Sequence, residues 1–154
     1  TKFLLNRCVK IVSIDFFNKH IKIIDNIEEL MIYSYENELL QVIINILNNA
    51  KDELIKVEKE QNRIIFIDLY KEQNNLIIKI KDNAGGIKKE IMNRIFEPYF
   101  TTKHKSNGTG IGLYMCEEIV VKHIKGKIKV SNEEYIFEDK NFTGALFEIS
   151  IPIE

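Results

Sequence analysis

The sequence of 154 residues has no tryptophan, two prolines and two cysteines. Cys8 and Cys116 are too few to staple a small secreted domain and too far apart for a metal-binding spacing, so a reduced, cytoplasmic setting is expected. No apolar run exceeds four residues, as in 64–67, which excludes a transmembrane helix and a signal-peptide core. Neither charge dominates, since 22 basic residues face 23 acidic ones. This balance argues against a protein that coats nucleic acid or an anionic membrane.

What is present suits one folded domain. Hydrophobic residues make up 45% and charged residues 29% of the chain, enough to bury a core and stay in solution. We expect residues 1–154 to form a single domain without internal repeats or linkers. The chain opens at Thr1 without a methionine, which we interpret as the start of a domain taken from a longer protein.

Hydrophobic periodicity predicts an α+β fold, with helices on a mixed, largely antiparallel sheet. Helices are expected over residues 3–18, 37–56, 88–95 and 110–124. Strands are expected over 21–24, 31–35, 63–70, 76–81, 127–130 and 145–153. The strands 63–70 and 76–81 are predicted to form an antiparallel hairpin. A polar loop is expected over 132–141.

Glycine is concentrated in the middle of the chain, where five of the seven glycines fall between residues 85 and 112. Glycine gathers where the backbone takes a positive φ or approaches a ligand closely. The segment 85–112 is therefore predicted to carry the function.

Two asparagines, Asn45 and Asn49, lie four residues apart and so share one face of the predicted helix 37–56. Asparagine is a poor residue for a helix interior, and its amide oxygen is a hard ligand suited to Mg²⁺. The pair either meets a polar ligand or reflects a chain that is rich in asparagine.

The segment Asp82 to Ile87 follows a predicted strand and contains Gly85 and Gly86. It could form a turn and nothing more. Alternatively, Asp82 accepts a hydrogen bond from an exocyclic amine such as that of adenine, and the glycines let the base come close.

Glycines also alternate at Gly108, Gly110 and Gly112, where a helix is predicted to begin. Backbone N–H groups exposed by such glycines can face an anion. The spacing matches neither the Walker phosphate loop nor the dinucleotide fingerprint. Alone, the pattern is a weak signal.

The loop Phe96 to Lys103 is unusually aromatic and ends in Thr101, Thr102 and Lys103. Its aromatic side chains could simply plug the core. They could also anchor a mobile lid that brings Lys103 to a phosphate.

In this order, the four segments resemble the ATP-binding catalytic domain of bacterial sensor histidine kinases, which belongs to the superfamily of gyrase B, Hsp90 and MutL. The N box resembles 45–50, the G1 box 82–86, the F box 96–103 and the G2 box 108–113. The resemblance covers most of the chain. It implies the Bergerat fold, a two-layer sandwich of about three main helices on a mixed sheet, with ATP and Mg²⁺ as cofactors.

The resemblance also implies roles for particular residues. Asn49 would ligate Mg²⁺, and the catalytic group would comprise Asn45, Asn49 and Lys103. Asp82 would accept from the adenine amine. The implied ATP-binding residues are Asn45, Asn49, Asp52, Asp82, Ala84, Gly86, Ile87, Phe96, Phe100, Thr101, Thr102, Lys103, Gly108, Thr109, Gly110, Ile111, Gly112 and Leu113. Two of them depart from the family pattern, because Asp52 stands where a cation is frequent and Ala84 where glycine is frequent.

Asn45 stands where the related ATPases have a water-activating glutamate, and an amide cannot act as that base. Slow hydrolysis is therefore expected, with the γ-phosphate passing to a histidine on a separate dimerisation domain in two-component signalling. None of His20, His104 and His123 lies in a phospho-acceptor pattern, so the chain is expected not to phosphorylate itself. The other expected partner is a response regulator, and the parent protein could be anchored in a membrane.

Two other functions remain open on the same scaffold. One is a serine kinase of the anti-sigma-factor type, against which the loop 96–103 argues. The other is a degenerate nucleotide-binding module, against which Asn49, Asp82 and the three glycines of 108–113 argue.

Overall fold

The computed structural model describes residues 2–30, 35–57, 63–101 and 110–153. The elements along the chain are α1 (Lys2–Asn18), β1 (Ile21–Ile27), α2 (Glu36–Leu54), β2 (Arg63–Glu72), β3 (Asn75–Asp82), α3 (Lys89–Met92), α4 (Gly112–Glu117), a π-helical continuation of α4 (Glu118–His123), β4 (Lys127–Phe137) and β5 (Lys140–Pro152).

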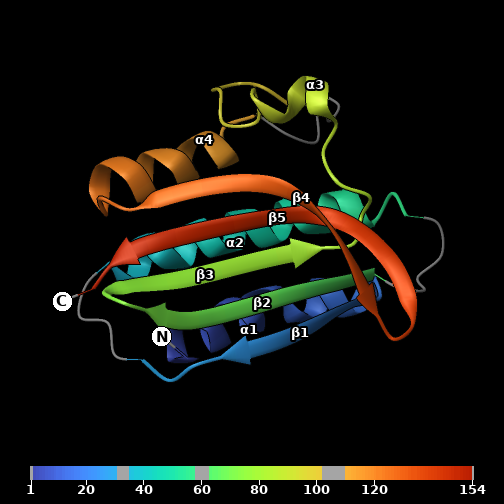
Figure 1. Ribbon diagram of the computed structural model, residues 1–154, viewed down its shortest axis with the longest axis horizontal. Coiled ribbons are helices and arrows are strands. Elements are labelled where there is room, and N and C mark those ends of the chain that lie inside the picture. Colours follow the sequence, from blue (N-terminus) through green and yellow to red (C-terminus); the bar gives the residue numbers. More distant parts are fainter. Residues whose placement is uncertain (1, 31–34, 58–62, 102–109, 154) are drawn as a thin grey trace.

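The five strands form one mixed sheet in the order β1-β2-β3-β5-β4. β1 and β2 pair in parallel, and the other neighbours pair antiparallel. Helices α1 and α2 lie behind the sheet in Figure 1, and α2 packs against both α1 and α4. The predicted α+β fold of helices layered on a mixed sheet is confirmed.

The core lies between α2 and the sheet. The apolar positions of α2 repeat with the helical period and are all buried: Leu39, Val42, Ile43, Ile46, Leu47, Ala50 and Leu54. Alternate residues of β2, namely Ile65, Ile67 and Leu69, meet them from the sheet. The polar residues of α2 therefore lie on the sides of the helix that face away from the core.

Arg63, the first residue of β2, ties the carboxyl ends of two helices together. Its guanidinium donates to the carbonyl of Lys19 just after α1, at 2.7 Å, and to those of Ile55 and Val57 just after α2, at 3.2 and 2.9 Å. One cation thus satisfies backbone acceptors that helix ends leave without partners.

The prediction of a polar loop over 132–141 is wrong, because β4 continues to Phe137 and β5 begins at Lys140. The two strands are joined by Glu138 and Asp139, both with positive φ. Hairpin turns of this type usually contain glycine, so the sequence carries no turn signal here. Tyr135 and Phe137 also pack edge-on against Phe66 of β2, with ring centroids 5.6 and 5.1 Å apart, which stabilises the extended hairpin.

Other predicted boundaries differ by less. The short helix α3 spans four residues rather than 88–95, and α4 begins at Gly112 rather than at residue 110. Most of the expected strand 31–35 lies outside the described residues. Tyr35 itself precedes α2 with φ 66°, a left-handed conformation that no strand uses.

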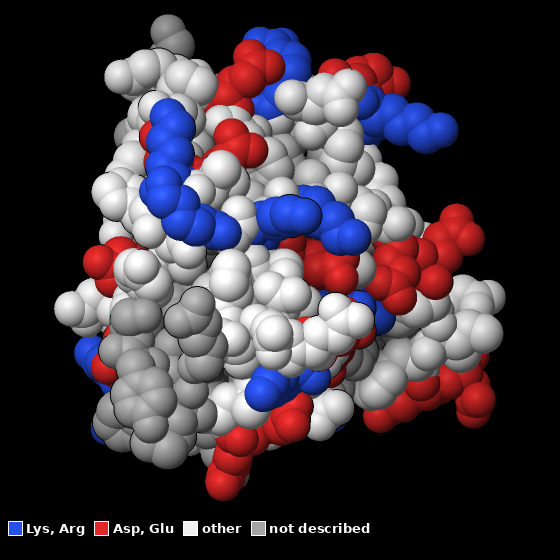
Figure 2. All heavy atoms as spheres, turned by 60° about the vertical axis from the view of Figure 1, so that its left-hand side comes forward, with Lys and Arg blue, Asp and Glu red and all other residues white. Residues whose placement is uncertain are grey.

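Charges of both signs are interspersed over the face shown in Figure 2, in keeping with the near-neutral net charge. Among the described residues, no helix is both long and apolar enough to cross a membrane.

Candidate nucleotide-binding site

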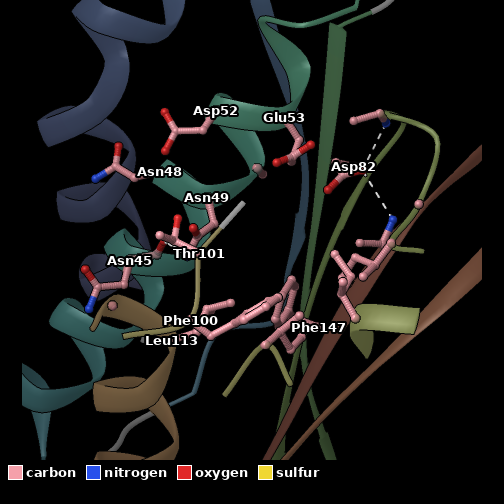
Figure 3. Close-up of a pocket in the computed structure, with 18 of the residues that line it drawn as sticks. Asn45, Asn48, Asn49, Asp52, Glu53, Asp82, Phe100, Thr101, Leu113 and Phe147 are labelled. Atoms are coloured by element: carbon pink, nitrogen blue, oxygen red, sulfur yellow. Dashed lines mark hydrogen bonds between the residues drawn. The ribbon is translucent and has the colours of Figure 1, made fainter. Parts of the chain in front are cut away.

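A pocket of about 550 Å³ lies beside α2, between this helix and the end of β3 (Figure 3). This volume is within the range of small-molecule and cofactor sites. Its lining comes from α2, β3, the segment after β3, the segment before α4, α4 itself and β5.

Most of the residues predicted from the sequence meet at this pocket. Those that line it are Asn45, Asn49, Asp52, Asp82, Ala84, Gly86, Ile87, Phe100, Thr101, Gly110, Gly112 and Leu113. Phe96 and Ile111 are not among the lining residues. Thr102, Lys103, Gly108, Thr109 and His104 lie outside the described residues. His20 and His123 are exposed and are not among the lining residues.

The polar face of α2 forms one wall. Asn45 and Asn49 are partly buried, and the Asn49 side chain donates from Nδ2 to the backbone carbonyl of Asn45 at 3.1 Å. The buried thiol of Cys116 on α4 donates to the backbone carbonyl of Val42, one turn before Asn45 on α2, at 3.7 Å. The first bond holds the Asn49 amide in place, and the second joins α4 to α2 beside this polar surface.

The cation expected near Asp52 is not supplied by Lys51. Lys51 points to the other side of α2, where its Nζ lies 2.8 Å from a carboxylate oxygen of Asp15 on α1. This pair joins α1 to α2 instead of serving the pocket.

Asp82 is the buried carboxylate of the site, with 5% of its surface exposed. Its Oδ1 accepts from the backbone N–H groups of Ala84 at 3.0 Å and Ala145 at 3.2 Å (Figure 3). The Tyr135 hydroxyl donates to the backbone carbonyl of Asp82 at 2.9 Å. The carboxylate is therefore held in one orientation, and Oδ2 is the oxygen that neither of these bonds uses.

Burial raises the pKa of Asp82 from its ordinary value of 3.8 to about 6. The N–H groups of Ala84 and Ala145 oppose the rise, and the nearby negative charge of Glu53 adds to it. At neutral pH the group is still mostly ionised, and it can accept a hydrogen bond from a ligand amine.

Sequence reasoning missed three charged residues of the pocket: Glu53, Lys56 and Lys88. Glu53 lies one helical turn after Asn49, and Lys56 one turn after Asp52. The four-residue spacing from residues already selected could have found both. Lys88 follows the glycine segment after β3 and carried no signal of its own.

Two described residues between α3 and α4 are joined by a backbone hydrogen bond, in which the N–H of Tyr99 donates to the carbonyl of Gly110 at 3.0 Å. Gly110 has φ 73°, and a Cβ there would collide with the backbone of Tyr99 and Phe100. Phe96 packs edge-on against Phe147, with ring centroids 6.4 Å apart. Phe96 therefore contacts a residue of β5 that lines the pocket.

Residues from the four separate segments of the sequence line one pocket. The profile described as "Histidine kinase-, DNA gyrase B-, and HSP90-like ATPase" matches residues 34–154. The chain belongs to this family. Membership in it implies ATP binding.

Curated relatives of this HATPase_c domain are sensor kinases. It is 31% identical over 128 residues to the two-component sensor PprA of Pseudomonas aeruginosa, an alignment that covers 82% of this chain and 13% of PprA. It is 34% identical over 122 residues to sporulation kinase E of Bacillus subtilis, covering 79% of this chain and 15% of that kinase. The chain therefore spans only about one seventh of the length of these relatives.

Solved structures agree on the fold. The catalytic domain of the histidine kinase ThkA superimposes with a TM-score of 0.80 and 25% identity, over 99% of this chain and 91% of that one. ThkA has also been solved with the response regulator protein TrrA, and that kinase aligns with a TM-score of 0.75 and 22% identity over 100% of this chain and 40% of that one. The present chain is thus a HATPase_c catalytic domain of the sensor histidine kinase type.

Proposed function

We propose that this domain binds Mg·ATP in the pocket beside α2 and donates the γ-phosphate to a histidine on a separate dimerisation domain. The observation that carries the proposal is the position of the buried Asp82 in the same pocket as Asn45 and Asn49. An adenine base needs a fixed acceptor for its amine, and phosphates need amide and backbone donors. Both kinds of group are present in this one site.

Asp82 would accept from the adenine amine through Oδ2, since the two backbone donors engage Oδ1. Asn45 would donate from its amide to the phosphates, and the backbone at Gly110 and Gly112 would approach them from the start of α4. Lys103, with Thr102, Gly108 and Thr109, would complete this part of the site.

The residues present fit a magnesium ion bound mainly through the nucleotide. Because Nδ2 of Asn49 is engaged with the Asn45 carbonyl, Oδ1 is the atom suited to ligate Mg²⁺. The described residues contain no cluster of three or more His, Cys, Asp or Glu side chains that could hold a metal. Mg²⁺ usually keeps several water and phosphate ligands in proteins, to which Asn49 would add one protein ligand. When bound, Mg²⁺ neutralises charge on the phosphates.

In the proposed reaction, a histidine nitrogen attacks the γ-phosphorus, the bond to the β–γ bridging oxygen breaks, and ADP leaves. The domain positions the nucleotide and shields developing charge. Asn45 cannot remove a proton from water, so hydrolysis is slow and the phosphoryl group is kept for the histidine. The phosphorylated dimerisation domain would then pass the phosphoryl group to a response regulator. The solved complex of ThkA with the response regulator TrrA supports this partner.

The test is phosphoryl transfer from γ-labelled ATP to the dimerisation domain of the parent protein, supplied as a separate polypeptide. We expect acid-labile, base-stable label on that domain and none on this chain alone. Acid-stable label on serine would instead favour the serine kinase. Nucleotide binding without transfer would favour the degenerate module.

A further inference from the structure

Two acidic side chains share the end of the pocket where Asp82 lies. Figure 3 shows the Glu53 carboxylate on α2 directed towards Asp82, whereas Asp52 points away from it. Glu53 and Asp82 both line the pocket, and the charge of Glu53 adds to the rise of the Asp82 pKa. Like charges placed together make ionisation of the more buried one harder.

A cation accompanies Glu53. Nζ of Lys56 lies 3.0 Å from Oε1 of Glu53, and Lys56 also lines the pocket. Both side chains are about half exposed, so this pair contributes little to folding. Its position beside a buried carboxylate gives it an electrostatic role instead, because Lys56 offsets the charge of Glu53.

The other groups around Asp82 are neutral donors and two further charged residues of the pocket lining. Tyr135 reaches its backbone carbonyl from β4, and the N–H groups of Ala84 and Ala145 reach Oδ1. Lys88 and Asp52 also line the pocket. Of Glu53, Asp52 and Lys88, Glu53 is the residue whose charge acts directly on the Asp82 carboxyl group, and Lys56 acts on it by offsetting the charge of Glu53.

We propose that Glu53 and Lys56 act together as positioning residues that set how much of Asp82 is ionised, and thereby set the affinity of the pocket for an adenine base. The inference rests on the proposed function, in which Asp82 accepts from the adenine amine. An ionised carboxylate is the stronger acceptor. Glu53 favours the protonated form of Asp82, and Lys56 opposes that effect. Removing the charge of Glu53 or that of Lys56 must therefore shift the pH at which binding of the adenine base weakens on acidification. The two variants must shift this pH in opposite directions.

The first measurement is the titration of the Asp82 side-chain carboxyl carbon by carbon-13 NMR in the intact chain without ligand. We expect Glu53→Gln to lower its midpoint and Lys56→Met to raise it, each by about half a pH unit. Glu72→Gln and Lys71→Met are matched controls, because these two exposed residues lie at the β2 end remote from Asp82. Midpoints equal to those of the controls, or shifted in the same direction, would overturn the proposal.

The second measurement is the affinity for adenosine between pH 5 and 8, since adenosine lacks phosphates that titrate in this range. At pH 5.5 we expect about twofold tighter binding by Glu53→Gln and about two- to threefold weaker binding by Lys56→Met, with convergence at pH 8. Equal changes at all pH values would indicate direct contact with the base and overturn the proposal. If no form binds adenosine at any pH, the proposed function fails, and the NMR midpoints alone decide whether the pair controls Asp82.

Discussion

Gly144 of β5 packs directly against the backbone carbonyl of Asp82, and a side chain at this position would collide with it. The next residue of β5 supplies the Ala145 N–H that holds Oδ1 of Asp82. The absence of one side chain thus allows β5 to approach closely enough to orient the buried carboxylate.

Gly144→Ala should displace β5 from Asp82. We expect a loss of about 1–3 kcal/mol in the free energy of unfolding, measured by urea denaturation, because the new methyl group cannot be accommodated without a backbone shift. ADP affinity should fall as well. Asn141→Ala, at an exposed position of the same strand, is the control and should change neither quantity. Equal stability of the two variants would contradict the packing described.

Asp82 should impose a pH dependence on stability. Its pKa is raised in the folded state from 3.8 to about 6, so the folded state binds more protons than the unfolded state between these values. The stabilising contribution is complete below about pH 4 and is lost as the pH rises through 6. The difference in unfolding free energy between wild type and Asp82→Asn should therefore change by about 2 kcal/mol between pH 4 and pH 7, in favour of the variant at pH 7. A constant difference across this range would contradict the raised pKa.

Arg63→Met should be strongly destabilising because it leaves carbonyls at the ends of two helices without their donor. We expect a loss of about 2–4 kcal/mol. Arg7→Met is the matched control, since Arg7 forms an exposed ion pair with Glu36 that is worth less than about 1 kcal/mol. Thermal or chemical denaturation of both variants measures the loss in the free energy of unfolding. A similarly small loss in each would contradict the role of Arg63 in joining the ends of α1 and α2.

Asn49→Ala should abolish the contribution of Mg²⁺ to nucleotide binding while leaving adenosine affinity unchanged, because only the amide oxygen at the phosphate end is removed. Titration of ADP with and without Mg²⁺ measures this. Asn26→Ala, at an exposed position of β1 that does not line the pocket, is the control. Undiminished dependence on Mg²⁺ in Asn49→Ala would exclude this ligand.

The secondary-structure elements with a regular hydrophobic period could be predicted from the sequence. The buried stripe of α2 and the hairpin of β2 and β3 are as predicted, since each follows from side-chain spacing. The turn at Glu138 and Asp139 was not predictable, because its left-handed backbone is adopted without glycine. The site was predicted as a set of motifs, whereas Gly144 and Tyr135 reach Asp82 only through strand pairing, which no local pattern encodes.

The most direct test of the account is calorimetric titration of this chain with ADP, with and without Mg²⁺, and with GDP as the comparison. The account predicts binding that prefers ADP over GDP and strengthens with Mg²⁺, and it predicts that Asp82→Asn loses the preference for adenine. Equal affinity for ADP and GDP in the wild type, or no binding of either, would contradict an adenine nucleotide site built on Asp82.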